Sequence, residues 1–81
     1  MNEERLLNRI ACDSRVMMGK PIIKGTRLTV EYILNLLAQD STVQEILDEY
    51  RGLTKEDIHA CLLFASQSLG NMSFMPLAEL A

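Results

Sequence analysis

Apolar side chains recur at the spacing of one helix face in three successive segments between Thr29 and Gly70. In each segment they fall at i, i+3, i+4 and i+7, the pattern of an amphipathic helix that buries one stripe. The three stripes are Val30, Ile33, Leu34 and Leu37, then Val43, Ile46, Leu47 and Tyr50, then Ile58, Cys61, Leu62, Ala65 and Leu69. Short links between three such helices leave few arrangements other than a bundle in which the third helix crosses the first two.

Polar residues before each segment predict where the helices begin. Thr29 can accept a hydrogen bond from the first turn of the helix that follows, as an N-cap residue does. Residues 41–44, Ser-Thr-Val-Gln, have the spacing of a capping box in which Gln44 bonds back to the cap. Thr54 and Asp57 repeat this spacing at the start of the third helix.

The link Arg51–Leu53 between the second and third predicted helices is short and contains Gly52. Glycine adopts the left-handed conformation that ends many helices without a Cβ penalty. A link of this length and composition is typical of a helix-turn-helix pair. The sequence therefore predicts a mainly α domain over residues 29–70, a tri-helical helix-turn-helix unit.

Residues 1–28 and 71–81 flank this unit and have other patterns. Arg9–Cys12 and Pro21–Lys24 are short β-prone runs around a loop, which favours a small hairpin or arm. An isolated hairpin is barely stable in water, so it must pack on the helices or pair with its copy in a second chain. Residues 71–81 lie beyond the glycine that ends the third helix and contain a proline, so we expect an extended apolar tail. All three parts form one structural domain.

The net charge of −3 hides an uneven distribution. Residues 5–27 have a net charge of +5 and residues 28–81 a net charge of −6, with Glu3 and Glu4 making up the total. A basic arm on an acidic body suits an arm that meets nucleic acid or a body that meets a basic protein, while a solvated surface charged by chance is the alternative. The predicted nucleic-acid-binding residues are Lys20, Lys24, Arg27, Arg51 and Lys55.

The third helix is an incomplete match to a helix that reads DNA bases. Its first turns offer Lys55 and His59, but also Glu56 and Asp57, and acidic side chains that face phosphates would be repelled. The helical geometry thus supports a helix-turn-helix, and the chemistry only partly supports DNA binding through it.

A chain of 81 residues buries only roughly 60% of its unfolded surface, so we expect at least a homodimer or higher homo-oligomer. Two side chains widen the apolar arc of the third helix, and we predict that they meet another subunit or the tail, unless that helix is simply more enveloped by its own domain. The tail is predicted to pack on its own or a neighbouring subunit, or to dock in the groove of a partner protein. The predicted interface residues are Leu63, Phe64, Met72, Phe74, Met75 and Leu77.

Catalytic and metal-binding patterns are not found in the sequence. The single histidine, His59, is predicted to be a partly exposed surface residue, and Cys12 and Cys61 to be small buried hydrophobic residues. Pro21 follows Gly19-Lys20 and removes a backbone donor that a phosphate-binding loop requires. We expect no enzymatic activity, no metal, no cofactor and no small-molecule substrate. An acidic N-terminus and no apolar run of about 18 residues predict a cytoplasmic protein that does not enter the membrane.

A resemblance to one protein family covers most of the chain, from about Leu6 to Ala65. Its most specific part is the segment that begins with Gly-Lys-Pro and ends with Gly-Thr-Arg, residues 19–27. The residues that carry it are Arg9–Asp13, Gly19–Val30, Ile33–Ala38, Glu45–Leu47, Tyr50, Leu53–Thr54 and Glu56–Ile58. They resemble a widespread bacterial and archaeal family described as the domain of unknown function number four hundred and thirty-three. That family commonly has Asp-Pro where this chain has Asp13-Ser14.

The resemblance implies a homeodomain-like tri-helical fold with a short β arm, and a role as the antitoxin of a toxin–antitoxin pair, since relatives are often encoded beside a PIN-like nuclease. Our leading hypothesis is accordingly a dimeric antitoxin-like protein that neutralises a PIN-like nuclease and binds its own operator DNA. The alternatives are a DNA-binding regulator without a toxin, and a homo-oligomeric structural module.

Overall fold

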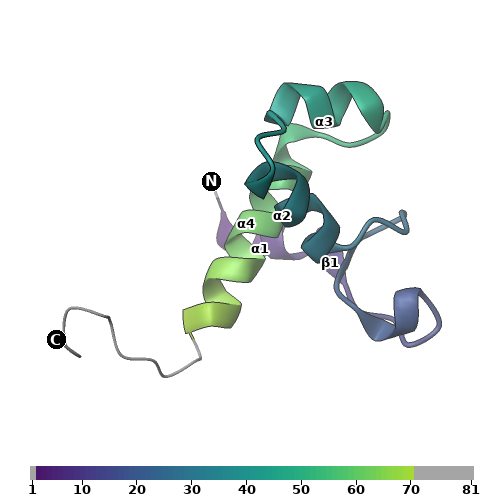
Figure 1. Ribbon diagram of the computed structural model, residues 1–81. Helices are drawn as coiled ribbons and strands as arrows, with labels where there is room; N and C mark the ends of the chain where they lie inside the picture. The colour runs from purple at the N-terminus through teal and green to yellow at the C-terminus, as the bar shows by residue number, and fades with distance from the viewer. Residues whose placement is uncertain (1, 71–81) are drawn as a thin grey trace, which may run out of the picture.

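Residues 2–70 are described by a computed structural model (Figure 1). The fold is mainly helical with a small two-stranded antiparallel sheet near the N-terminus, as the sequence predicts. In chain order the elements are α1 (Glu3–Leu7), β1 (Ile10–Ala11), the 3₁₀ helix η1 (Met17–Gly19), β2 (Ile22–Ile23), α2 (Val30–Ala38), α3 (Val43–Glu49) and α4 (Lys55–Gly70). The predicted tail, residues 71–81, lies outside the described residues.

The three predicted helices begin at capping residues, with one change of register. The Thr29 hydroxyl accepts a hydrogen bond from the Tyr32 amide at 3.0 Å, which confirms the predicted N-cap of α2. The capping box of α3 pairs Thr42 with Glu45, so the prediction that Gln44 closes it is wrong. The cap is one residue later than predicted, and the third residue of the helix is therefore the glutamate.

The start of α4 has the predicted box geometry. The Thr54 amide donates to Asp57 Oδ2 at 2.9 Å, and the Asp57 amide donates to Thr54 Oγ1 at 3.3 Å. Gly52 has a φ of +99°, the left-handed conformation that the sequence predicts there, although α3 already ends at Glu49. The turn between α3 and α4 therefore covers residues 50–54, longer than the predicted link.

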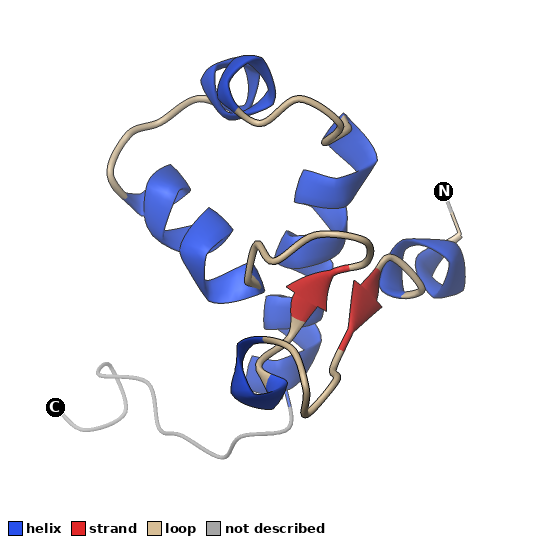
Figure 2. Cartoon of the chain, turned by 90° about the vertical axis from the view of Figure 1, so that its right-hand side faces the viewer, coloured by secondary structure: helices blue, strands red, loops and turns tan. Residues whose placement is uncertain are grey.

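The two short strands form the predicted hairpin. They pair antiparallel, with Ile10 opposite Ile23 and Ala11 opposite Ile22, and a further bridge joins Ile22 to Thr29 at the start of α2. Figure 2 shows the strands side by side with helices around them. The hairpin therefore packs on the helices, as a pair of strands this short requires in water.

The core lies where β2, α2, α3 and α4 meet. Its fully buried side chains are Ile23, Ile33, Ile46, Ile58 and Cys61. Helix α4 contacts α1, β1, α2 and α3, so it forms the centre of the fold. This is the predicted arrangement in which the last helix packs against the two before it.

Helix α1 is an element that the sequence analysis did not predict, since residues 1–28 were expected to hold only short strands. Asn2 caps it by accepting hydrogen bonds from the amides of Glu4 and Arg5 at 2.8 and 3.3 Å. The helix packs on α4, where the Gln67 amide group donates to Glu3 Oε2 at 3.2 Å. The N-terminal residues are thus part of the domain and not a free arm.

The two cysteines differ in exposure. Cys12 is exposed, so the prediction that both are buried is wrong for this residue, which follows a strand of only two residues and enters the loop. Cys61 is fully buried in the core as predicted. Burial and the nearby negative charge of Asp57 raise the pKa of the Cys61 thiol to about 11, so this thiol stays protonated and unreactive at neutral pH.

Candidate protein and nucleic-acid interfaces

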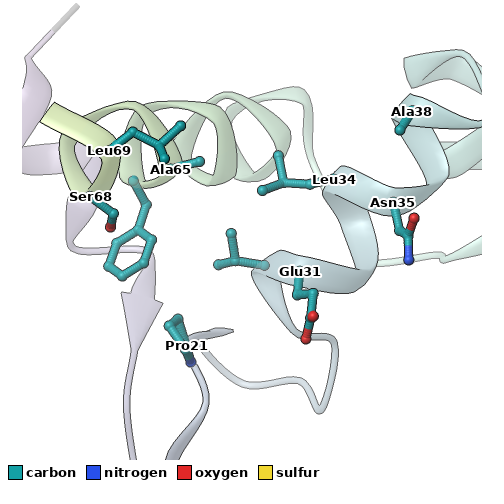
Figure 3. Close-up of a pocket in the computed structure, with 10 residues that line it drawn as sticks. Pro21, Glu31, Leu34, Asn35, Ala38, Ala65, Ser68 and Leu69 are labelled. Carbon is teal, nitrogen blue, oxygen red and sulfur yellow. The ribbon is translucent and has the colours of Figure 1, made fainter. Parts of the chain in front are cut away.

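A groove of about 580 Å³ lies between α2 and α4. Leu34 of α2 points across it toward Ala65 and Leu69 of α4, and Pro21 bounds it on the side of the hairpin (Figure 3). Polar side chains lie along its edges. The residues that line this α2–α4 groove are Pro21, Val30, Glu31, Leu34, Asn35, Ala38, Phe64, Ala65, Ser68 and Leu69.

A second, smaller pocket of about 300 Å³ lies on the other side of Phe64, between α4 and the N-terminal elements. Leu7, Ile10 and Cys12 line it together with Gln67 and Ser68. Phe64, which is half-buried, therefore borders both the α2–α4 groove and this pocket. Binding pockets are predominantly lined by apolar and aromatic side chains, as these two are at Phe64.

Leu63, the other predicted interface residue on α4, is also half-buried. It lies one helical turn before Gln67, which bonds to α1, so it belongs to the side of α4 that α1 partly covers. The remaining predicted interface residues, Met72, Phe74, Met75 and Leu77, lie outside the described residues. The homo-oligomer stays a prediction.

Two leucines assigned to the buried stripe of the last helix are exposed. Leu62 is 46% exposed and Leu69 is 63% exposed, so their predicted burial is wrong. The physical reason for Leu69 is that α2 and α4 are separated by a groove at this position, so α2 does not cover its side chain. The exposed Leu69 side chain instead borders the α2–α4 groove.

The predicted basic residues are all exposed, and the structure arranges them in pairs. Lys24 and Arg27 line a shallow pocket of about 490 Å³ at the turn after β2, while Arg51 and Lys55 flank the α3–α4 turn. Among residues 2–70, none of these four forms an ion pair. The turn after β2 and the C-terminal end of α3 lie on the same, right-hand side of the molecule in Figure 1. Lys20 differs, because its Nζ lies 3.2 Å from Glu31 Oε1.

The side chain of Asp57 is turned toward the interior of the protein. Its Oδ1 accepts a hydrogen bond from Arg9 Nη1 at 3.0 Å, its Oδ2 accepts from Thr54, and its side chain is only 10% exposed. Repulsion of phosphates by acidic side chains at the start of α4 stays a prediction, but the charge of Asp57 is paired with that of Arg9, the residue directly before β1. Sequence patterns gave no signal for this ion pair.

A pair of tyrosines joins α2 to the end of α3. The hydroxyls of Tyr32 and Tyr50 are hydrogen-bonded, and their rings meet edge to face with centroids 6.0 Å apart. The hydrogen bond from Tyr32 is the main cause that raises the pKa of Tyr50 to about 12, so its hydroxyl remains protonated at neutral pH. This contact connects two helices and supplies no general base.

Metal ligands are not gathered within residues 2–70, where no group of three His, Cys, Asp or Glu side chains is placed to hold an ion. His59 is half-buried on α4, as predicted for a partly exposed residue. None of the helices in the described part of the chain is long and apolar enough to span a bilayer.

Comparison with known proteins identifies a solved structure and an archaeal protein that this chain resembles. A crystal structure of a DUF433 member protein from Anabaena variabilis ATCC 29413 is similar with a TM-score of 0.74 at 30% sequence identity, over 83% of this chain and 66% of that one. The match thus spans just under two thirds of the solved relative. An uncharacterized protein of Archaeoglobus fulgidus is 56% identical over 25 residues, which are 31% of this chain and 69% of the archaeal one.

The family described as "Protein of unknown function (DUF433)" matches residues 10–65, from β1 into the middle of α4. These residues include the whole hairpin, the Arg9-facing Asp57 and the α3–α4 turn, and exclude α1 and the end of the groove at Ser68 and Leu69. More than half of the chain is matched, and the chain belongs to the DUF433 family.

Proposed function

We propose that this chain is an antitoxin-like binding protein that neutralises a PIN-like nuclease through an apolar surface centred on Phe64 of α4. The observation that carries the proposal is the position of Phe64 between the α2–α4 groove and the pocket beside α1. Buried aromatic anchors that contact neighbouring depressions contribute much of the affinity of protein interfaces.

Charge supports the same partner. Residues 28–81 have a net charge of −6, and complementary potentials accelerate the encounter of an acidic protein with a cationic nuclease. The catalytic role then belongs to the nuclease, and this chain needs only an apolar patch with a polar rim, which Glu31, Asn35 and Ser68 supply.

The test is binding to a PIN-like nuclease encoded beside this chain. We expect the two purified proteins to form a complex by size-exclusion chromatography and the nuclease activity to fall in that complex. Leu69→Asp should weaken binding by at least about 10-fold, because it places a charge beside the groove. Leu62→Asp is the matched control, since Leu62 is an exposed leucine of the same helix outside the groove. Equal loss in both variants, or no complex, would contradict the proposal.

A DNA-binding regulator is the second candidate, favoured by the four exposed cations that lack ion pairs within residues 2–70. With Asp57 paired to Arg9, Glu56 is the other acidic side chain in the first turn of α4, next to Lys55. Phosphate contacts by such cations fix a protein on DNA and make its affinity depend on salt.

We expect Lys24→Ala with Arg27→Ala to weaken binding to DNA upstream of the coding sequence and to reduce the slope of log affinity against log salt by about 2, since each phosphate contact contributes about 0.9. Arg15→Ala is the control, because Asp13 already holds that guanidinium through two side-chain hydrogen bonds. Fluorescence anisotropy at several salt concentrations measures both quantities. DNA binding that does not strengthen as salt is lowered would exclude this candidate. A chain that binds neither DNA nor the nuclease would favour a structural module.

A further inference from the structure

The α2–α4 groove ends where the described chain ends. Ser68 and Leu69 line it, and the chain continues past Gly70 into a segment with the sequence Asn-Met-Ser-Phe-Met-Pro-Leu-Ala. We propose that residues 72–77 of the same chain fold back and occupy this groove, and so cover Phe64 and Leu69 in the free protein. The proposal concerns the protein alone and does not depend on a nuclease partner.

Reach and direction favour this occupant. An extended segment of six residues spans about 20 Å, whereas the nine residues of α2 rise only about 13 Å along the groove. The chain must reverse direction after α4 to enter the groove, and Gly70 and Asn71 are residues that adopt tight turns readily. The six residues are therefore long enough to follow the α2 side of the groove along its whole length.

The chemistry of the segment matches the groove. Met72, Phe74, Met75 and Leu77 are apolar and uncharged, and the flexible thioethers of methionine fill irregular depressions well. An extended backbone needs hydrogen-bond partners for its amide and carbonyl groups. Glu31, Asn35 and Ser68 on the edges of the groove offer acceptors and donors for that purpose. Proline at position 76 has no amide hydrogen to satisfy.

A segment of the same chain is favoured over a second copy by its concentration. A short covalent link gives an effective concentration of about millimolar, so a second chain occupies the groove only above that concentration or with further contacts. The consequence is regulatory, since any partner that binds around Phe64 must first displace residues 72–77. The partner's apparent affinity is then its affinity for the open groove multiplied by the fraction of chains in which the groove is open.

The test is NMR spectroscopy on the full-length chain with labelled methyl groups. We expect nuclear Overhauser effects between the Phe74 ring and the methyl groups of Leu34 and Leu69. Phe74→Ala should shift the resonances of these groove leucines, whereas Leu80→Ala, in the same tail but beyond the proposed contact, should leave them unchanged.

A mixed sample of labelled and unlabelled chains separates the two origins of the contact. We expect no Overhauser effects between chains and no change of the groove shifts on tenfold dilution. Contacts that appear only between chains would assign the groove to a second copy and overturn the proposal. Groove shifts that do not respond to Phe74→Ala would show that the tail does not bind there, and would overturn it as well.

Discussion

Ile33→Ala is expected to lower the free energy of unfolding by about 2–5 kcal/mol, the usual cost of removing a fully buried aliphatic side chain. Ile33 has no exposed surface and packs with Ile23, Ile46 and Ile58 in the core. A chain of 81 residues has a total stability of only about 4–12 kcal/mol, so much of the variant should be unfolded. Urea denaturation followed by far-UV circular dichroism measures the loss.

The control for this prediction is Leu62→Ala, at a position of α4 that is 46% exposed and lies outside the α2–α4 groove. Truncation of an exposed leucine on a helix is expected to change stability by no more than about 0.5 kcal/mol. Similar losses in the two variants would mean that the described core is not where the chain gains its stability.

Asp57→Ala is expected to lower the free energy of unfolding by about 2–4 kcal/mol. The substitution removes a helix-capping contact to Thr54, worth about 1 kcal/mol, and also leaves Arg9 without its partner in a partly buried ion pair. Arg9 is 41% exposed, so water screens it and the loss falls below that of a fully buried pair. Thermal and urea unfolding of the purified variant measure it.

Glu45→Ala supplies a matched control, because Glu45 closes the equivalent capping box at the start of α3 and forms no ion pair among residues 2–70. Its expected loss is about 1 kcal/mol. The difference between the two variants measures the Arg9 contact, and Arg9→Ala in the Asp57→Ala background should add little. A loss at Asp57 no larger than at Glu45 would contradict a stabilising ion pair.

The helices of residues 29–70 could be predicted from the sequence because their signals are local. Thr29 and Thr54 cap helices whose apolar residues follow at regular spacing, and the structure has both contacts. The error at Gln44 arose because Ser41 and Thr42 are both good capping residues, so two registers of the box were available one residue apart. In the later register Thr42 and Glu45 form both hydrogen bonds of the box.

Features that depend on distant residues were not predictable from local patterns. Helix α1 has only five residues and a single capping signal at Asn2, and it is held by α4 through contacts such as Glu3 with Gln67. The Arg9–Asp57 pair joins residues 48 positions apart. Exposure of Cys12 and Leu69 likewise depends on where neighbouring elements lie.

The candidate interfaces were predictable in part. Phe64 was identified because it widens the apolar arc of its helix, and it does border two depressions. The groove itself needed the structure, since Pro21 and Leu34 face residues of α4 that are far from them in the sequence. The basic residues were identified by type, but only the structure separates Lys20, which pairs with Glu31, from Lys24 and Arg27.

The position of α4 has a consequence during synthesis of the protein. Ile23, Ile33 and Ile46 are made before Ile58 and Cys61, the side chains of α4 that complete their packing. Because the ribosome adds about 5–20 residues per second, these isoleucines remain without their packing partners for a time on the order of seconds. Chaperones that bind apolar nascent segments can therefore bind this protein until α4 has left the ribosome and packs on these side chains.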